Sequence, residues 1–297
     1  MRGNPAAHPS SKSSSGDGRA RQKKTVALAL GAGGARGLAH IAVLEALDEM
    51  GIRPKAIAGA SIGALIGAAY AAGMSAKDIR RHVIALAHDR AEIWRGLMAA
   101  RVAPLSLSGL LTAPFGNPVL IGAEKFVAAF MPKTVPDDFA RLAIPLLIVA
   151  TDLYARHATI FSDGPLKPAL AAAMAIPGLV RPVEIGGRVH VDGGAVDPLP
   201  FAALAGRADI VVAVDCSGEP CAPQQIPDPW EALFTTITVM GQAIVAEKLK
   251  HGAPDLVIRP RVGTFRLLDF FHASAILRAA EPIKGEVKER LSALIAP

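Results

Sequence analysis

Residues 25–37 read Thr-Val-Ala-Leu-Ala-Leu-Gly-Ala-Gly-Gly-Ala-Arg-Gly, which is a short apolar run followed directly by a glycine-rich loop. The apolar run is typical of a strand that is buried on both faces. Beyond the loop, large apolar residues recur at helical spacing, at Leu38, Ile41, Leu44 and Leu47. Gly51 then stands where a helix C-terminal cap is expected. A buried strand, a glycine loop and a helix in this order open an α/β fold.

Strands and helices continue to alternate along the rest of the chain. Apolar runs predict further strands at residues 55–60, 144–150, 158–161, 188–191, 209–215 and 256–259. Helical patterns cover residues 62–72, 168–176, 229–250 and 273–294, and a capping box of Ser75 and Asp78 opens one more helix. This alternation predicts a mostly parallel central sheet flanked by helices. Residues 90–140 mix large apolar side chains with Pro and Gly, and we expect a partly helical lid or cap there.

The composition predicts a folded core and a separate basic tail. Of the 297 residues, 51% are hydrophobic and 20% are charged, which excludes disorder throughout the chain. The formal net charge is +6, but residues 1–24 carry six basic residues against Asp17 alone, so the remaining chain is near +1. A nucleic-acid-binding domain carries its basic patch on a folded face, so no nucleic-acid partner is expected. We expect residues 1–24 to be disordered and residues 25–297 to form one domain.

The cysteines and the apolar segments indicate a cytoplasmic location. Cys216 and Cys221 form neither a C-x-x-C pair nor a disulfide framework, which excludes a zinc ribbon and favours reduced thiols. The tail lacks the apolar region of a secretory signal. Residues 56–76 are uncharged and long enough to span a bilayer, but their many Gly and Ala residues favour a buried strand, turn and helix.

The glycine loop at residues 31–37 predicts an anion site. Glycines let backbone N–H groups approach a ligand closely, and the following helix points its positive end at the loop. Such a loop can hold a phosphate or the oxyanion of acyl transfer. A dinucleotide fingerprint needs an acidic residue at the end of the second strand, where this chain has Ala60 and Ser61.

Residues 59–63, Gly-Ala-Ser-Ile-Gly, match the G-x-S-x-G nucleophile elbow between a predicted strand and a predicted helix. The simpler interpretation is a strand-to-helix turn in which Ser61 is only the N-cap. The glycine loop after the neighbouring strand favours the nucleophile, because its amides can stabilise an oxyanion beside Ser61.

Ser61 needs a base, and the sequence offers two candidates close together. Asp192 ends a predicted strand and precedes two glycines, which exposes its side chain at a sheet edge. It is a weak base unless burial raises its pKa, and its simplest interpretation is an Asp-Gly turn. His190 shares a strand face with Asp192, although a histidine in a strand is more often structural.

The glycine loop, the Ser61 elbow and Asp192-Gly193-Gly194 occur in the order found in patatin-like phospholipases, and the chain resembles the bacterial branch of short, single-domain members. The resemblance implies a three-layer α/β/α fold and a Ser61–Asp192 dyad without histidine. It also implies an oxyanion hole at Ala32, Gly33 and Gly34, steadied by Arg36. No cofactor or catalytic metal is implied. The chain departs from common family residues at Ala32, Ala173 and Asp197.

The function implied by this resemblance is hydrolysis of lipid acyl esters, with an acyl lipid as substrate and transient contact with the inner membrane surface. Two other classes stay open at this point. One is an α/β-hydrolase with a Ser-His-Asp triad, for which His251 is the late histidine. The other is a non-catalytic anion- or nucleotide-binding regulator that uses the glycine loop. The sequence specifies neither the lipid nor the oligomeric state.

Overall fold

The computed structural model describes residues 24–88, 122–219 and 226–296. Residues 1–23 of the predicted tail and most of the predicted lid at residues 90–140 lie outside these ranges. The part of the lid region that is described contains the helix α6 (Ala123–Phe130) and a 3₁₀ turn at Phe139–Arg141.

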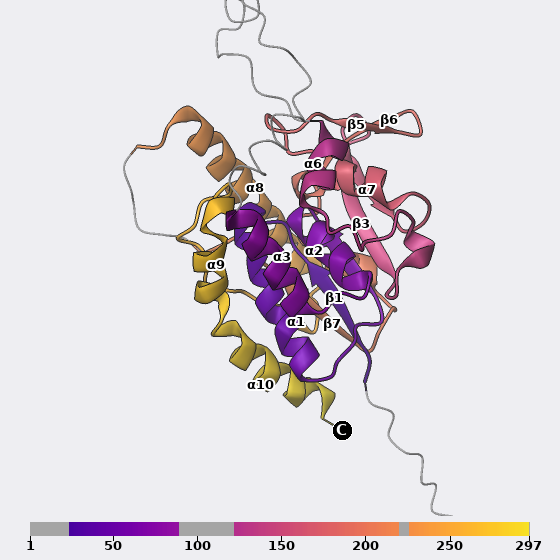
Figure 1. The fold of residues 1–297 in the computed structure, drawn as a ribbon, viewed down its shortest axis with the longest axis vertical. Helices are drawn as coiled ribbons and strands as arrows, with labels where there is room; N and C mark the ends of the chain where they lie inside the picture. Colours follow the sequence, from indigo (N-terminus) through magenta and orange to yellow (C-terminus); the bar gives the residue numbers. More distant parts are fainter. Residues whose placement is uncertain (1–23, 89–121, 220–225, 297) are drawn as a thin grey trace, which may run out of the picture.

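The centre of the fold is one eight-stranded sheet (Figure 1). Its strands are β1 (Val26–Leu30), β2 (Ile57–Ala60), β3 (Leu146–Asp152), β4 (His157–Phe161), β5 (Val183–Ile185), β6 (Arg188–Asp192), β7 (Ile210–Val214) and β8 (Leu256–Ile258). They lie in the order β5-β6-β3-β2-β1-β7-β8, and β4 pairs with β3 outside this path. The five strands β3, β2, β1, β7 and β8 are mutually parallel, which confirms the predicted α/β class.

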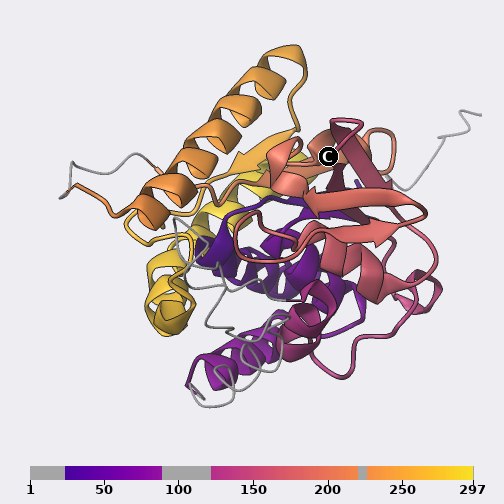
Figure 2. The same cartoon turned by 90° about the horizontal axis from the view of Figure 1, so that it is seen from above.

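Helices cover both faces of the sheet. They are α1 (His40–Glu49), α2 (Ile62–Ala71), α3 (Ala76–His88), α7 (Leu166–Ala173), α8 (Pro229–His251), α9 (Ala273–Ala280) and α10 (Ile283–Ile295). Figure 2 shows the orange α8 on one side of the sheet and the indigo helices on the other.

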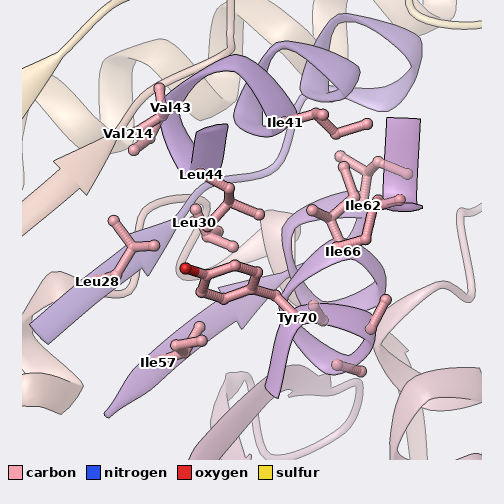
Figure 3. Packing of buried hydrophobic residues seen from close by; sticks show 14 of the residues in the cluster. Leu28, Leu30, Ile41, Val43, Leu44, Ile57, Ile62, Ile66, Tyr70 and Val214 are labelled. Atoms are coloured by element: carbon pink, nitrogen blue, oxygen red, sulfur yellow. The ribbon is translucent and has the colours of Figure 1, made fainter. Parts of the chain in front are cut away.

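The side chains of β1 explain why the two faces differ. Leu28 and Leu30 point into the larger core with α1 and α2, whereas Ala27 and Ala29 point into a smaller cluster with Val245 of α8. Alternate residues of a strand face opposite sides of a sheet, so one sequence serves both layers. Figure 3 shows the larger core, where side chains from β1, α1 and α2 interlock.

One predicted strand is confirmed with a pairing that we did not predict, and one predicted helix is wrong. The predicted strand at residues 188–191 is present as β6, but it runs antiparallel to β3 and pairs with β5 in a hairpin that we did not predict. The single helix predicted at residues 273–294 is divided into α9 and α10. Pro282 is the N-cap of α10, and a proline inside a continuous helix would remove a hydrogen bond and clash with the preceding turn.

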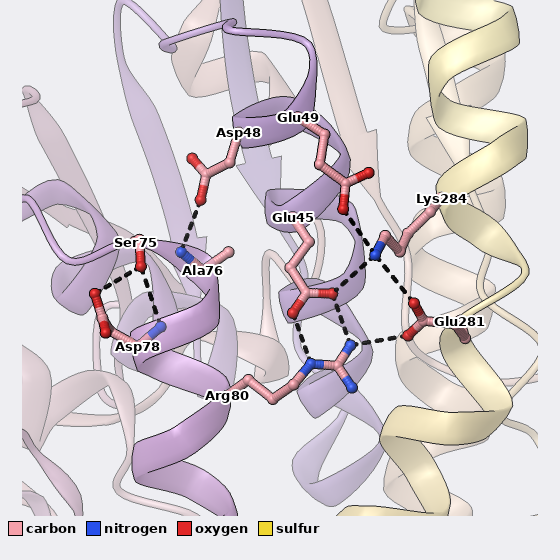
Figure 4. Close-up of polar contacts among 9 residues, drawn as sticks. All are labelled: Glu45, Asp48, Glu49, Ser75, Ala76, Asp78, Arg80, Glu281 and Lys284. Atoms are coloured by element: carbon pink, nitrogen blue, oxygen red, sulfur yellow. Dashed lines mark hydrogen bonds and ion pairs between the residues drawn. The ribbon is translucent and has the colours of Figure 1, made fainter.

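Ion pairs join three helices at the far end of α1 (Figure 4). Arg80 of α3 donates from Nε and Nη2 to the two carboxylate oxygens of Glu45, at 2.6 and 2.7 Å. Lys284 of α10 lies 2.9 Å from Glu49 and 3.4 Å from Glu45. The Glu45 carboxylate is buried, so the two cations balance a charge that water does not reach.

One described helix, α8, is long and apolar enough by length and composition to cross a membrane, and 17% of its apolar window is buried. The segment at residues 56–76 forms β2 and α2, which confirms the predicted strand, turn and helix.

Candidate active site

Two strands that meet end to end on β3 bring the predicted nucleophile and base together. β2 runs parallel to β3 and ends with Ala60 opposite Val149. β6 runs antiparallel to β3 and ends with Asp192 opposite Ala150, the next residue along β3. The carboxyl ends of β2 and β6 therefore converge on the same point, and Ser61 follows β2 directly.

Ser61 occupies a sharp turn between β2 and α2. Its backbone has φ 53° and ψ −129°, a conformation that residues with a side chain rarely adopt. The flanking glycines allow this turn because side chains would not fit there. A Cβ on Gly59 would lie 2.5 Å from Ala64 Cα, and one on Gly63 would lie 2.2 Å from Leu30 O. Backbone strain of this kind costs about 1–3 kcal/mol and is concentrated at functional sites.

The hydroxyl of Ser61 donates a hydrogen bond to Asp192 Oδ2 at 2.6 Å. Asp192 Oδ1 accepts from the Gly194 N–H at 2.8 Å, so both carboxylate oxygens have a donor. The Asp192 backbone is also held, because its carbonyl accepts from Thr151 Oγ1 at 2.9 Å and its N–H donates to Ala175 O at 3.0 Å.

Burial raises the pKa of Asp192 to about 6, because the charged carboxylate loses its hydration. The hydrogen bonds from Ser61 and Gly194 oppose this shift without cancelling it. An aspartate with a pKa near 6 is a stronger base than one in water and is still ionised at neutral pH.

The glycine loop lies beside this pair, but three of its amides already have partners. The N–H groups of Gly31, Ala32 and Ala35 donate to Val214 O, Pro198 O and Leu267 O at 3.0, 2.8 and 2.7 Å. Ala32 was predicted to donate to an oxyanion, and in this structure the single hydrogen of its N–H is directed at Pro198 O.

The amides of Gly33 and Gly34 differ from the others in the loop. Among the residues that the structure describes, no backbone carbonyl accepts from either N–H. Gly34 has φ +57°, and a Cβ there would lie 2.2 Å from Leu267 O. This position therefore needs glycine both for its backbone angle and for the close approach of Leu267.

Arg36, near the end of the loop, has 7% of its surface exposed. Its Nε donates to Gly33 O at 3.5 Å, and its Nη2 donates to Thr238 Oγ1 of α8 at 3.0 Å. These contacts connect the loop to α8.

A pocket opens over the pair and runs along α8. Its polar side includes Gly33, Gly34, Arg36, Ser61 and Asp192. Its apolar wall includes Ile176, Ile237, Met240, Ile244, Val245 and Leu267. Ser61 and Asp192 thus line a mostly apolar pocket.

The histidines that offered alternative bases lie elsewhere. His190 is buried and has no hydrogen-bond partner among the described residues. Its ring packs edge-on against that of Phe161, with 5.4 Å between the ring centroids. His251 lies at the exposed end of α8, 3.1 Å from Glu247. His40 is buried under the glycine loop, where its Nε2 lies 2.8 Å from Gly31 O. Burial lowers the pKa of His40 to about 4, so the ring is neutral and Nε2 donates to this carbonyl.

Sequence reasoning missed the contribution of α8 and of Thr151 to the site. The stretch from Ala232 to Ala246 contains no charged residue, although a long surface helix normally has a charged outer face. This uncharged stretch was the sequence signal that α8 could line an apolar pocket. Within the described residues, no group of three or more His, Cys, Asp or Glu side chains is placed to hold a metal ion.

Comparison with known proteins identifies the family of this chain. A model of the patatin-like phospholipase family matches residues 28–205, and the chain therefore belongs to this family. An uncharacterized NTE family protein of Mycobacterium tuberculosis is 38% identical over 212 residues, covering 71% of this chain and 54% of the relative. Human patatin-like phospholipase domain-containing protein 6 is 33% identical over 199 residues, covering 66% of this chain and 14% of that protein.

The chain spans about half the length of the mycobacterial relative, 54%. Among solved structures, VipD from Legionella pneumophila has a TM-score of 0.49 and 15% identity, covering 90% of this chain and 67% of that chain. ExoU from the type III secretion system of Pseudomonas aeruginosa has a TM-score of 0.42 and 15% identity, covering 93% and 54%.

Proposed function

We propose that this chain is a serine lipid acyl hydrolase that cleaves carboxylic esters through a Ser61–Asp192 dyad. The observation that carries the proposal is the 2.6 Å hydrogen bond from the Ser61 hydroxyl to the buried Asp192 carboxylate. A serine hydroxyl becomes a useful nucleophile when an adjacent base takes its proton. Membership of the patatin-like phospholipase family supports the same reaction class.

In the first half of the reaction, Ser61 Oγ attacks the ester carbonyl carbon and Asp192 Oδ2 accepts its proton. The oxygen of the tetrahedral intermediate receives hydrogen bonds from the amides of Gly33 and Gly34. Removal of one such donor typically costs about 2.7–4 kcal/mol of transition-state stabilisation. The intermediate then collapses, the bond to the alcohol oxygen breaks, and Asp192 returns the proton to the leaving alcohol.

In the second half, a water molecule attacks the acyl-serine ester and gives its proton to Asp192. A second tetrahedral intermediate forms and collapses, and Ser61 takes the proton back as the fatty acid leaves. The same carboxylate serves as base and acid in both halves, which suits a group whose pKa lies about one unit below neutral pH.

The substrate proposed is an acyl lipid whose chain lies along α8. The groove wall formed by Ile237, Met240 and Ile244 is apolar, and an acyl chain gains free energy when it leaves water for such a surface. Because acyl lipids in water reside in membranes or micelles, transient contact with a membrane surface belongs to the same proposal.

The test is hydrolysis of p-nitrophenyl butyrate and of phosphatidylcholine, lysophosphatidylcholine and monoacylglycerol by the wild type, Ser61→Ala and Asp192→Asn. We expect both variants to lose activity by a factor of at least 10³, since the nucleophile or its base is gone. Matched controls are Ser292→Ala and Asp163→Asn, at exposed positions of α10 and of a loop.

Activity that survives in Ser61→Ala would refute the dyad. Activity that survives in Asp192→Asn but disappears in His190→Ala would favour a histidine base instead. Phosphate-dependent ligand binding without any ester hydrolysis by the wild type would favour the anion-binding regulator.

A further inference from the structure

Lys248, near the C-terminal end of α8, contacts the segment at residues 192–199 that begins with the proposed base, Asp192. Lys248 Nζ forms an ion pair with Asp197 Oδ1 and donates to Leu199 O at 3.2 Å. The ammonium also lies 4.9 Å from the centre of the Phe201 ring. The Lys248 side chain is 25% exposed and that of Asp197 is 15% exposed, so water screens this ion pair only in part.

The segment from Asp192 to Leu199 contacts both halves of the proposed machinery. At its start is Asp192, the partner of Ser61. In its middle, the Asp197 N–H donates to Gly193 O at 2.9 Å and closes a turn. Near its end, Pro198 O accepts the N–H of Ala32 at 2.8 Å, so the glycine loop is positioned by this segment.

Leu199 packs into the smaller core cluster, but residues 198–200 donate few backbone hydrogen bonds that would fix the segment. Pro198 and Pro200 have no N–H and donate no backbone hydrogen bond. Residues 197–200 belong to no helix or strand. The glycine loop also fits closely, since a Cβ on Gly31 would lie 3.0 Å from Leu199 Cδ1 and 3.1 Å from Pro198 O. A displacement of Pro198 or Leu199 would therefore be transmitted to the loop.

We infer that Lys248 is a positioning residue for the proposed hydrolysis. Through Asp197 and Leu199 it holds the segment that carries Asp192 and that fixes the glycine loop through Pro198. It touches neither substrate nor the reacting atoms. The inference rests on the proposed function, and it predicts that loss of the ammonium lowers the rate of the chemical step more than it lowers substrate binding.

The test compares kcat and KM for p-nitrophenyl butyrate at 25 °C in the wild type and in Lys248→Met, whose unbranched side chain is slightly shorter and carries no charge. A misplacement of about 1 Å in catalytic geometry can cost about 10²-fold in rate, so we expect kcat to fall by about 10- to 100-fold. We expect KM to change by less than about threefold, because Lys248 does not line the pocket. Lys248→Arg should recover most of the lost kcat.

Two controls separate positioning from general stabilisation. Lys250→Met removes a neighbouring lysine of α8 that pairs with Glu247 at the surface, and its kcat should match the wild type. Arg80→Met destabilises the protein through the remote network of Figure 4, and its folded fraction should keep the wild-type kcat. Thermal melts confirm that each variant is folded at the assay temperature.

Asp197→Asn provides a second route if Lys248→Met does not fold, because it keeps the shape of the partner and removes its charge. We expect a kcat loss of a few-fold, and no further large loss when both changes are combined. If the wild type is active and the Lys248 and Asp197 variants all keep its kcat, the inference is wrong and the proposed function stands. A kcat loss in Arg80→Met as large as in Lys248→Met would also overturn it. A wild type that hydrolyses no ester overturns the proposed function and this inference with it.

Discussion

Asp192→Asn should abolish activity, and its stability relative to the wild type should increase as the pH rises. Burial raises the pKa of Asp192 from 3.8 to about 6, so the folded protein binds a proton more tightly there than the unfolded chain does. Below pH 3.8 both states are protonated and the raised pKa costs nothing. As the pH rises from 3.8 through 6, stability is lost by up to about 1.4 kcal/mol for each pH unit, or about 3 kcal/mol in all.

An asparagine carries no charge and does not incur this cost. It also cannot accept both the Ser61 O–H and the Gly194 N–H as the carboxylate does, which costs about 1.5–3 kcal/mol at every pH. This hydrogen-bond loss is the same at every pH, so it does not affect how the stability difference between the two proteins changes with pH. At pH 4.5 the carboxylate cost is only about 1 kcal/mol, so the stability of Asp192→Asn relative to wild type should rise by about 2 kcal/mol between pH 4.5 and pH 7.5.

The measurement is thermal or urea unfolding of both proteins at the two pH values. For a domain of this size, about 2 kcal/mol corresponds to a change of about 4–8 °C in the difference between the two Tm values. Asp163→Asn, at an exposed position, should show no such change. A Tm difference between Asp192→Asn and wild type that is the same at both pH values would show that Asp192 has an ordinary pKa and is no stronger a base than an aspartate in water.

Four further predictions test other parts of the structure. The kcat/KM of ester hydrolysis should rise with pH and level off above a midpoint near 6, since only ionised Asp192 accepts the Ser61 proton; a profile that is flat between pH 5 and 8 would contradict this base. Gly241→Ala should stabilise α8 by about 0.5–1 kcal/mol in urea unfolding, because its new Cβ would lie 3.8 Å from Pro198 Cβ, an ordinary contact. Gly241→Leu should instead fill the pocket and shift the preference in a p-nitrophenyl ester series toward shorter acyl chains; an unchanged preference would place the chain elsewhere. Arg80→Met should cost about 2–3 kcal/mol in urea unfolding, since buried Glu45 then keeps only Lys284 at 3.4 Å, and a loss near zero would show that water already compensates the carboxylate.

The sequence predicts the local parts of the site well. The glycines around Ser61 and the Asp192 turn are encoded within a few residues, because steric exclusion at Gly59 and Gly63 acts on immediate neighbours and on one adjacent strand. The same holds for β1, whose apolar run is continuous because both of its faces are covered.

The route by which Asp192 reaches Ser61 was predicted for the wrong reason. We expected both residues at one edge of parallel strands, but β6 is antiparallel. The signal was present in Gly186 and Gly187, which have φ of 59° and 74° and join β5 to β6 by a two-residue hairpin turn. Such a glycine pair between two short strands is typical of a hairpin, and a hairpin reverses the chain.

Contacts between distant segments could not be predicted in this way. The Ala32 N–H was expected to donate to an oxyanion. Its hydrogen bond to Pro198 O depends on how residues 192–199 cross the glycine loop. The pairing of Lys248 with Asp197 depends on where α8 lies on the sheet. Neither relation leaves a pattern in the residues near it, because both partners belong to segments about 50 or more positions apart.

The position of the proposed dyad depends on the register of β3 with two other strands. Ala60 lies opposite Val149 and Asp192 opposite Ala150, so β3 sets the separation of Ser61 and Asp192. A slip of β6 by one residue would move Asp192 by about 3.3 Å and turn its side chain to the other face of the sheet. The 2.6 Å bond to Ser61 would then be broken. The strained backbone of Ser61 and the buried carboxylate of Asp192 each cost free energy. They are retained side by side because packing of the core around β3 stabilises this strand register by more than these two residues cost.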